Sequence, residues 1–400
     1  MAKNKEVAII GAGVIGCSIG YHLARKGIKP TIIEKEAIGA RASGKAWAVV
    51  VYPINMLAMA KTPGSFWAMP DGETIEKWQD LYLTGYYRLA DLALDIWERG
   101  KIDIEFGVSP WTMVAVSEKA ETRLKDNAAY LKEHEHCECK WISSEELRRI
   151  FPNISENVRG GISFPQLQVE PYKYTLGLAQ SAEALGAQIK SGTVVDFKKK
   201  GNRILSAVLS SGTEIKADEF VIAAGPWSGQ IASLLGYDIP LTIIMEECLR
   251  IKAPKGYPLH SLAGGVEILS RVNGDIILAT GEIQSVEHYF SSKARPDFDD
   301  SLSEDVKIKN IGAALEILPD LEQFKLIEHR GDLLAYGAEP YYHKPVMGRF
   351  PRWQNGYIAT AFGGMGIHLS AGTGEVMADL IAEGYSPHRV QCLLEHLSPR

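Results

Sequence analysis

The first 35 residues show a regular change in hydrophobic period. Residues 7–10 are all apolar, residues 11–16 are rich in glycine, and residues 17–26 carry apolar side chains at the spacing of a helix. A second apolar run, 31–33, ends at Glu34. The pattern predicts a strand, a tight turn, a helix and a second strand.

The rest of the chain alternates between helical and strand periods. Helical spacing predicts helices over 71–100, 118–133, 171–185, 302–318 and 370–381, with a short capped helix after Ser143. Short apolar runs predict strands at 102–106, 111–116, 140–142, 187–197, 205–209, 214–217, 219–224, 331–336 and 357–361, and antiparallel strands between 240 and 281.

This order predicts an α/β chain, α+β overall, with two units. Segments typical of a nucleotide-binding sheet recur at the start, middle and end of the chain, separated by two meandering sheet segments. We therefore expect a discontinuous dinucleotide-binding domain from residues 1–100, 145–225 and 326–400. The insertions, 101–144 and 226–325, would form a substrate-binding domain.

Composition narrows the class of protein. The 400 residues are 46% hydrophobic and 23% charged, with a net charge of -6, which argues against nucleic acid as a partner. The first apolar segment, 7–15, is short and broken by glycine, so we expect neither a signal peptide nor a membrane span.

The five cysteines show no disulfide-framework spacing, which favours a reducing cytoplasm. Residues 134–139, His-Glu-His-Cys-Glu-Cys, contain ligand types that suit zinc but lack the spacing of a common structural site. A solvated loop is the better interpretation, and we expect no metal.

The glycine-rich turn carries the strongest chemical signal. Gly11 permits a tight turn, Gly13 lets the backbone approach a pyrophosphate, and Gly16 lets the helix pack on the sheet. The positive end of the helix then faces the phosphates, and Glu34 can accept hydrogen bonds from ribose hydroxyls. We infer a bound adenine dinucleotide.

Three further motifs favour a flavin over a nicotinamide. Residues 39–48 offer small side chains and a hydroxyl that can surround a pyrophosphate and a ribityl chain. Residues 221–228 place small residues at a strand end, where the backbone can pass a cofactor. The loop 362–368 precedes a helix, and its amides could stabilise negative charge on a reduced isoalloxazine.

Together these motifs resemble the family of FAD-dependent oxidoreductases that includes D-amino-acid oxidase, glycine oxidase and sarcosine oxidase. Phe164-Pro165, residues 169–171 and residues 185–187 also look like parts of that family. The resemblance implies a glutathione-reductase-like FAD-binding Rossmann domain with an inserted antiparallel-sheet substrate domain. The predicted cofactor-binding residues are Gly11, Gly13, Val14, Ile15, Gly16, Glu34, Lys35, Arg41, Ala42, Ser43, Ala46, Trp47, Ala48, Val194, Val195, Ala224, Gly225, Trp227, Gly363, Gly364, Met365, Gly366 and Ile367.

The resemblance also bears on how the flavin is attached. Some members bind it covalently through a histidine near 45–47 or a cysteine near 336–339, and this chain has neither residue there. We predict non-covalent FAD.

The chemistry that the resemblance implies is oxidation of an amine or amino acid. Hydride passes from the α carbon to flavin N5 and an imine leaves; glycine-like, N-methyl or cyclic secondary amino acids are the expected substrates. Alternatives are a flavin-dependent 2-hydroxy acid dehydrogenase, with His343 or His368 as base, and a non-catalytic flavin subunit of a complex.

The substrate pocket departs from the family pattern. Relatives carry an Arg-Pro that clamps a carboxylate, whereas this chain has Glu339-Pro340. The pocket candidates are Glu339, Tyr341, Tyr342 and His343; the candidate replacement cations are Arg41, Arg271, Arg330, Lys344 and Arg349. With Glu339, the acidic residues Glu246 and Glu267 suggest a second hypothesis, a cationic substrate such as a polyamine or a methylated amine.

The electron acceptor is expected to be oxygen or a quinone or electron carrier. Sarcosine oxidases place a lysine over the flavin, and this chain has Ala279 at the corresponding position. That difference favours a dehydrogenase. Further expected partners are a homo-oligomeric copy or the other subunits of a larger dehydrogenase complex.

Overall fold

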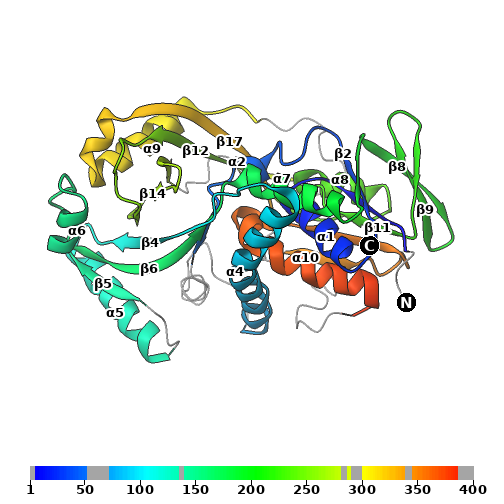
Figure 1. Cartoon of the computed structure of the whole chain (residues 1–400), viewed down its shortest axis with the longest axis horizontal. Coiled ribbons are helices and arrows are strands. Elements are labelled where there is room, and N and C mark those ends of the chain that lie inside the picture. The colour runs from blue at the N-terminus through cyan, green and yellow to red at the C-terminus, as the bar shows by residue number, and fades with distance from the viewer. Residues whose placement is uncertain are drawn as a thin grey trace.

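The computed structural model describes residues 5–51, 72–134, 139–280, 286–289, 300–337 and 345–385. Two sheets organise these residues, one at each end of the molecule in Figure 1. A six-stranded sheet and its helices lie at the right of the view, and a ten-stranded sheet curves through the left. This arrangement confirms the predicted fold class.

The six-stranded sheet is largely parallel. Its order is β18 (Val346–Arg349), β19 (Gly356–Thr360), β11 (Glu219–Ile222), β1 (Val7–Ile10), β2 (Thr31–Glu34) and β7 (Gln188–Ser191). All neighbours run parallel except β18, which pairs antiparallel with β19. Because β1 lies between β2 and β11, a crevice opens beyond its carboxyl end, where doubly wound sheets bind ligands.

Side chains of this sheet alternate between two cores. Val7 and Ile9 of β1 face the helices α1 (Val14–Arg25), α4 (Gly72–Gly100), α7 (Pro171–Ala184) and α10 (Gly366–Glu383). Ala8 and Ile10 face the opposite core. That core is formed with α8 (Ser228–Ser233) and the three-stranded sheet of β8 (Val194–Lys200), β9 (Arg203–Leu209) and β10 (Glu214–Lys216).

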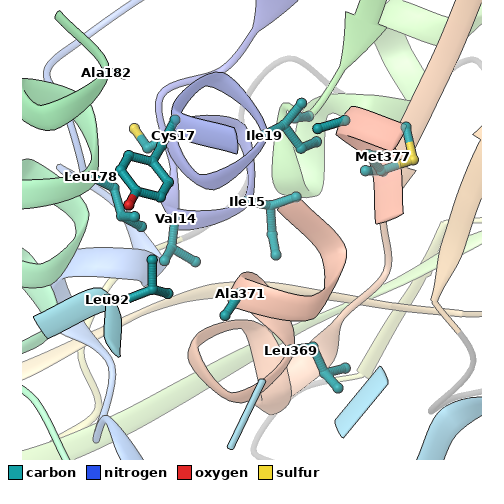
Figure 2. Close-up of a cluster of buried hydrophobic side chains, with 14 of the residues drawn as sticks. Val14, Ile15, Cys17, Ile19, Leu92, Leu178, Ala182, Leu369, Ala371 and Met377 are labelled. Carbon is teal, nitrogen blue, oxygen red and sulfur yellow. The ribbon is translucent and has the colours of Figure 1, made fainter. Parts of the chain in front are cut away.

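The helical core joins segments that are far apart in the sequence. Figure 2 shows Val14 and Ile19 of α1 together with Leu92 of α4, Leu178 of α7 and Leu369 of α10. All five side chains are almost completely buried. Helix α1 is therefore fixed in place by helices from the middle and the end of the chain.

The ten-stranded sheet is mostly antiparallel. Its main path is β16 (Val286–Tyr289), β12 (Leu241–Lys252), β15 (Asp275–Ala279), β14 (Glu267–Ser270), β13 (Ser261–Ala263), β4 (Gly107–Val114), β6 (Gly160–Gln168) and β3 (Val49–Val51). In addition, β17 (Lys325–Gly337) pairs with β12 and β5 (Lys140–Ser143) pairs with β6. Helices α6 (Ser144–Ile150) and α9 (Glu304–Ile317), with the turn η2 (Pro319–Gln323), cover one face, and α5 (Glu118–His134) packs on the other.

Several expected elements differ from the structure, among them the strand expected at 331–336, which begins at Lys325 as β17. Residues 102–106 form no strand, because Lys101 and Glu105 adopt positive φ angles of 55° and 53° that interrupt an extended run. The single strand expected at 187–197 is divided at Gly192 into β7 and β8, which belong to different sheets. The last helix begins at Gly366, four residues earlier than expected.

The domain boundaries remain a proposal. Strand pairing places β3, β6 and β17 in the ten-stranded sheet, although they fall within segments that we assigned to the dinucleotide-binding domain. These three strands therefore connect the two units.

Candidate active site

A cavity of about 990 Å³ runs between the two sheets. Its walls come from the β1–α1 turn, the segment after β2, the ends of β11 and β19, and one face of the ten-stranded sheet. The sequence motifs converge here, so the cavity is the candidate site.

The β1–α1 turn forms the first wall. Gly11 has a φ of 109°, and a Cβ atom there would lie 2.4 Å from the carbonyl oxygen of Ala223. A Cβ on Gly16 would lie 2.0 Å from the carbonyl oxygen of Gly11, so this glycine lets α1 pack on the turn. The N-cap residue of α1 is Gly13, which has no side chain to cap the helix. The Val14 amide in the first turn donates instead to Ser43 Oγ at 2.9 Å.

Glu34 ends β2 at the cavity. Its Oε2 accepts from the Ala12 amide at 2.7 Å and its Oε1 accepts from the Glu36 amide at 2.9 Å, so the carboxylate is held by backbone donors. Nearby, Lys35 Nζ lies 3.4 Å from the centroid of the Trp227 ring, in the turn η1 (Gly225–Trp227). This end of the cavity combines an acceptor, a cation and an aromatic surface.

The segment after β2 contains the short helix α2 (Ala42–Lys45). Lys45 Nζ pairs with the buried carboxylate of Asp332 at 2.7 Å. Arg271 donates to the carbonyl oxygens of Trp47 and Ala48, at 3.1 and 3.2 Å. These contacts fix the second wall against the ten-stranded sheet.

The loop η3 (Gly363–Met365) forms the third wall, directly before α10. Gly363 has a φ of 51°, and a Cβ there would lie 2.2 Å from the Tyr336 ring. The Gly364 amide donates to the Tyr336 hydroxyl at 3.0 Å, and that hydroxyl donates to Glu246 Oε1 at 2.5 Å. Burial raises the pKa of Glu246, while the hydrogen bond from Tyr336 lowers it.

The far end of the cavity lies on the ten-stranded sheet. Trp111, Met113 and Leu269 line it together with Glu267. Trp111 Nε1 donates to Glu267 Oε2 at 2.8 Å. Burial raises the pKa of Glu267 to about 7, so this carboxyl is partly protonated near neutral pH.

His368 also lines the cavity, on the first turn of α10. Burial lowers its pKa to about 3, so the ring is neutral over the ordinary pH range and is a weak base.

The predicted cofactor-binding residues line the cavity with two exceptions. Gly16 packs inside the β1–α1 turn, and Val195 has 47% of its surface exposed. The four pocket candidates Glu339, Tyr341, Tyr342 and His343 lie outside the described residues.

The candidate carboxylate-binding cations differ from one another in their positions and in their partners. Arg271 is buried and binds backbone carbonyls, and Arg330 donates to the carbonyl oxygen of Ala46 at 3.2 Å. Arg41 lines the cavity but pairs with Glu36 and Asp300. Arg349, on β18, is not part of the lining, and Lys344 lies outside the described residues.

Sequence reasoning missed several lining residues: Lys45, Trp111, Arg123, Thr280, Asp332 and Tyr336. Arg123, on α5, is exposed and makes no ion pair with another described residue. Thr280, and not the fully buried Ala279, reaches the cavity at the end of β15. Of this set, only Asp332 and Tyr336, four residues apart on β17, follow the strand alternation that could have indicated a shared face.

The residues present fit a flavin adenine dinucleotide. Three features suit its adenosine diphosphate part: the close backbone approaches that exclude a Cβ atom, the glycine at the start of α1 and the fixed Glu34 carboxylate. Small residues at Ala46, Ala224 and Gly364, followed by the start of α10, leave room for a flat ring.

The described residues also bear on membranes and metals. No helix among them is long and apolar enough to cross a membrane. In the same part of the chain, no group of three or more histidine, cysteine, aspartate or glutamate side chains is arranged to hold a metal ion. Cys139, from the cluster singled out in the sequence, is buried near the Ala128 carbonyl, while 135–138 lie outside the described residues.

Comparisons with known proteins agree on one family. A family model described as FAD dependent oxidoreductase matches residues 6–380. Glycine oxidase of Bacillus licheniformis is 24% identical over 383 residues, covering 95% of this chain and 94% of the relative. Mitochondrial dimethylglycine dehydrogenase of Mus musculus is 23% identical over 406 residues, covering 96% of this chain but 43% of the longer enzyme. The structure of glycine oxidase from Bacillus cereus superposes with a TM-score of 0.80 at 22% identity, covering 99% of both chains.

Proposed function

Because the chain belongs to the FAD dependent oxidoreductase family, we propose that it oxidises an amine or amino acid at the carbon that bears the nitrogen. The predicted family resemblance and the cofactor, FAD, are thereby confirmed. When bound, FAD supplies the oxidant by accepting a hydride from that carbon.

The observation that carries the proposal is the position of Glu246. Its carboxyl lies in the same cavity as the predicted flavin loop: a Cβ atom on Gly364 would be 3.7 Å from both carboxyl oxygens. Tyr336 occupies Oε1, and Oε2 makes no hydrogen bond to a described residue. An ammonium group can therefore be paired at Oε2.

The same carboxyl suits the proton step. An amine must lose its proton before the adjacent carbon can give up a hydride, so a nearby base favours the reaction. Burial raises the pKa of Glu246 toward that of an ammonium group, which makes its carboxylate a better proton acceptor. Glu246 Oε2 would hold the proton while Tyr336 keeps the carboxyl in place.

The glycine oxidase and dimethylglycine dehydrogenase relatives support substrates that are glycine-like or N-methylated. Cyclic secondary amino acids belong to the same proposal, since L-proline dehydrogenase of P. horikoshii has this fold. Of the two bases expected for a 2-hydroxy acid, His368 is a weak one and His343 lies outside the described residues, so a 2-hydroxy acid stays the alternative substrate class.

The remaining expectations concern the flavin and its acceptor. Non-covalent attachment stays part of the proposal, as do the predicted cofactor-binding residues. We favour a quinone or carrier protein over oxygen, since neither Ala279 nor Thr280, which lines the cavity at the end of β15, supplies a cation. Rapid reoxidation of the reduced protein in air would contradict that preference.

An anaerobic substrate panel tests the function. The purified protein should show flavin absorbance that bleaches on addition of an amine or amino acid. Glu246→Gln should bind FAD normally but bleach at least about tenfold more slowly, since the amide cannot accept the proton. Bleaching by hydroxy acids alone would refute the proposal.

A further inference from the structure

We propose that Glu267 and Trp111 form a second cation subsite, which holds a positively charged nitrogen remote from the carbon that is oxidised. The inference rests on the proposed function and names its substrate class more closely: a diamine or polyamine with an apolar linker. The positions of Glu267 and Glu246 in the ten-stranded sheet support it.

The two carboxyls point to the same face of the ten-stranded sheet. Glu267 pairs with Ala279, and the register of Leu249 with Leu278 puts Cys248 beside Ala279. Glu246 lies two residues before Cys248 on the same strand, and side chains two residues apart share a face. Both carboxyls accordingly line the cavity.

Their separation excludes a shared small ligand. Glu267 lies two strands away from Glu246, which is a lateral distance of about 10 Å between strand axes. Glu246 stands beside the loop at Gly364, whereas Glu267 stands beside Trp111. One amine nitrogen cannot occupy both positions, but the two ends of an extended amine can.

Glu267 has the properties of a cation-binding group. Trp111 Nε1 holds Oε2, and Oε1 makes no hydrogen bond to a described residue. Burial makes the lone ionised carboxyl costly, which a cationic ligand would relieve. The neighbouring walls are apolar, from Met113, Val114 and Leu269, and suit methylene groups.

Arg123 is the charged group in the lining that would favour an anionic ligand over a cationic one. It lines the cavity from α5 and would suit a carboxylate, but it is exposed, so water screens its charge more than that of Glu267. The competing outcome is thus a substrate whose distal group is an anion bound by Arg123.

The first test compares flavin bleaching by diamines and by monoamines of equal chain length, from four to ten carbons. We expect the diamines to react with a kcat/KM at least about tenfold higher. Glu267→Gln keeps an acceptor for Trp111 but loses the charge, so it should reduce that preference to below about twofold. Glu183→Gln, an exposed change on α7, is the matched control and should preserve the preference.

The second test measures binding without turnover. Hexamethonium, a dication that cannot be oxidised at its quaternary nitrogens, should perturb the flavin spectrum of the oxidised holoenzyme. Its Kd should rise about tenfold in Glu267→Gln, and thermal unfolding should show that the variant is folded. An unchanged Kd and an unchanged diamine preference would overturn the subsite.

Two other outcomes separate a failure of the subsite from a failure of the proposed function. If carboxylate-bearing amines react best and Arg123→Gln alone weakens them, the distal group is an anion and the inference is wrong. If no amine bleaches the flavin but hexamethonium binding depends on Glu267, the proposed function fails while the subsite stands.

Discussion

The Tyr336 hydroxyl joins Glu246 to the backbone of the loop at Gly364. It donates to Glu246 Oε1 at 2.5 Å and accepts from the Gly364 amide at 3.0 Å. Tyr336 belongs to β17 and Glu246 to β12, so a pair of long strands positions the acid beside the loop that begins α10. Removing this hydroxyl therefore affects both groups.

Tyr336→Phe should shift the pH dependence of flavin reduction. The hydrogen bond from Tyr336 lowers the pKa of Glu246, so its loss raises that pKa further. The carboxylate must be ionised to accept a proton, and the acidic limb of the rate profile should move to higher pH. Anaerobic stopped-flow reduction measures the profile. Tyr357→Phe, outside the cavity, should leave the limb in place.

Gly11→Ala should abolish FAD binding. The new Cβ would lie 2.4 Å from the Ala223 carbonyl oxygen, and the φ of 109° is unfavourable for alanine. The ratio of flavin to protein absorbance reports the loss. Gly312→Ala is the control, because this helical glycine on α9 has open space around it. We expect it to retain FAD and to gain roughly 1 kcal/mol of stability.

Glu267→Gln should stabilise the FAD-free protein at high pH. Burial raises the pKa of Glu267 from 4.5 to about 7, so the folded state binds a proton more tightly than the unfolded state. Stability is consequently lost as pH rises from 4.5 to 7. The variant lacks this loss. Its free energy of unfolding should therefore exceed that of the natural protein by up to about 3 kcal/mol above pH 7, with no gain below pH 4.5. Urea unfolding at several pH values measures the difference; a gain that is independent of pH would contradict it.

Lys45→Met should destabilise the fold. It leaves the carboxylate of Asp332, which is 2% exposed, without its ion-pair partner. Because Lys45 is partly exposed, we expect a cost of about 2 kcal/mol, below that of a fully buried pair. Adding Asp332→Asn should recover much of it, and a double-mutant cycle by denaturant unfolding measures the coupling. If the effects of the two substitutions on the free energy of unfolding were additive, the ion pair would contribute nothing to stability.

The sequence predicted the cofactor end of the site because its signals are local. Gly11, Gly13 and Glu34 lie on one strand–turn–helix–strand unit, where spacing alone implies the geometry. The fold class followed from the same motif and from the recurrence of similar segments along the chain.

The substrate end was less predictable because long-range pairing creates it. Strand β6 contains Pro165, a residue that disfavours strands, and it forms opposite Pro110 of β4. Trp111 and Glu267 come together only because β4, β13 and β14 are adjacent in the sheet. No local period in either segment indicates this contact.

The central strand β1 is paired on one side with β2 and on the other with β11, which itself pairs with β19. A nascent chain on the ribosome therefore carries the glycine turn long before it has the residues beyond 355 that complete the sheet. Loading of the vitamin-derived cofactor must be a late event in biogenesis, and truncated translation products should remain colourless.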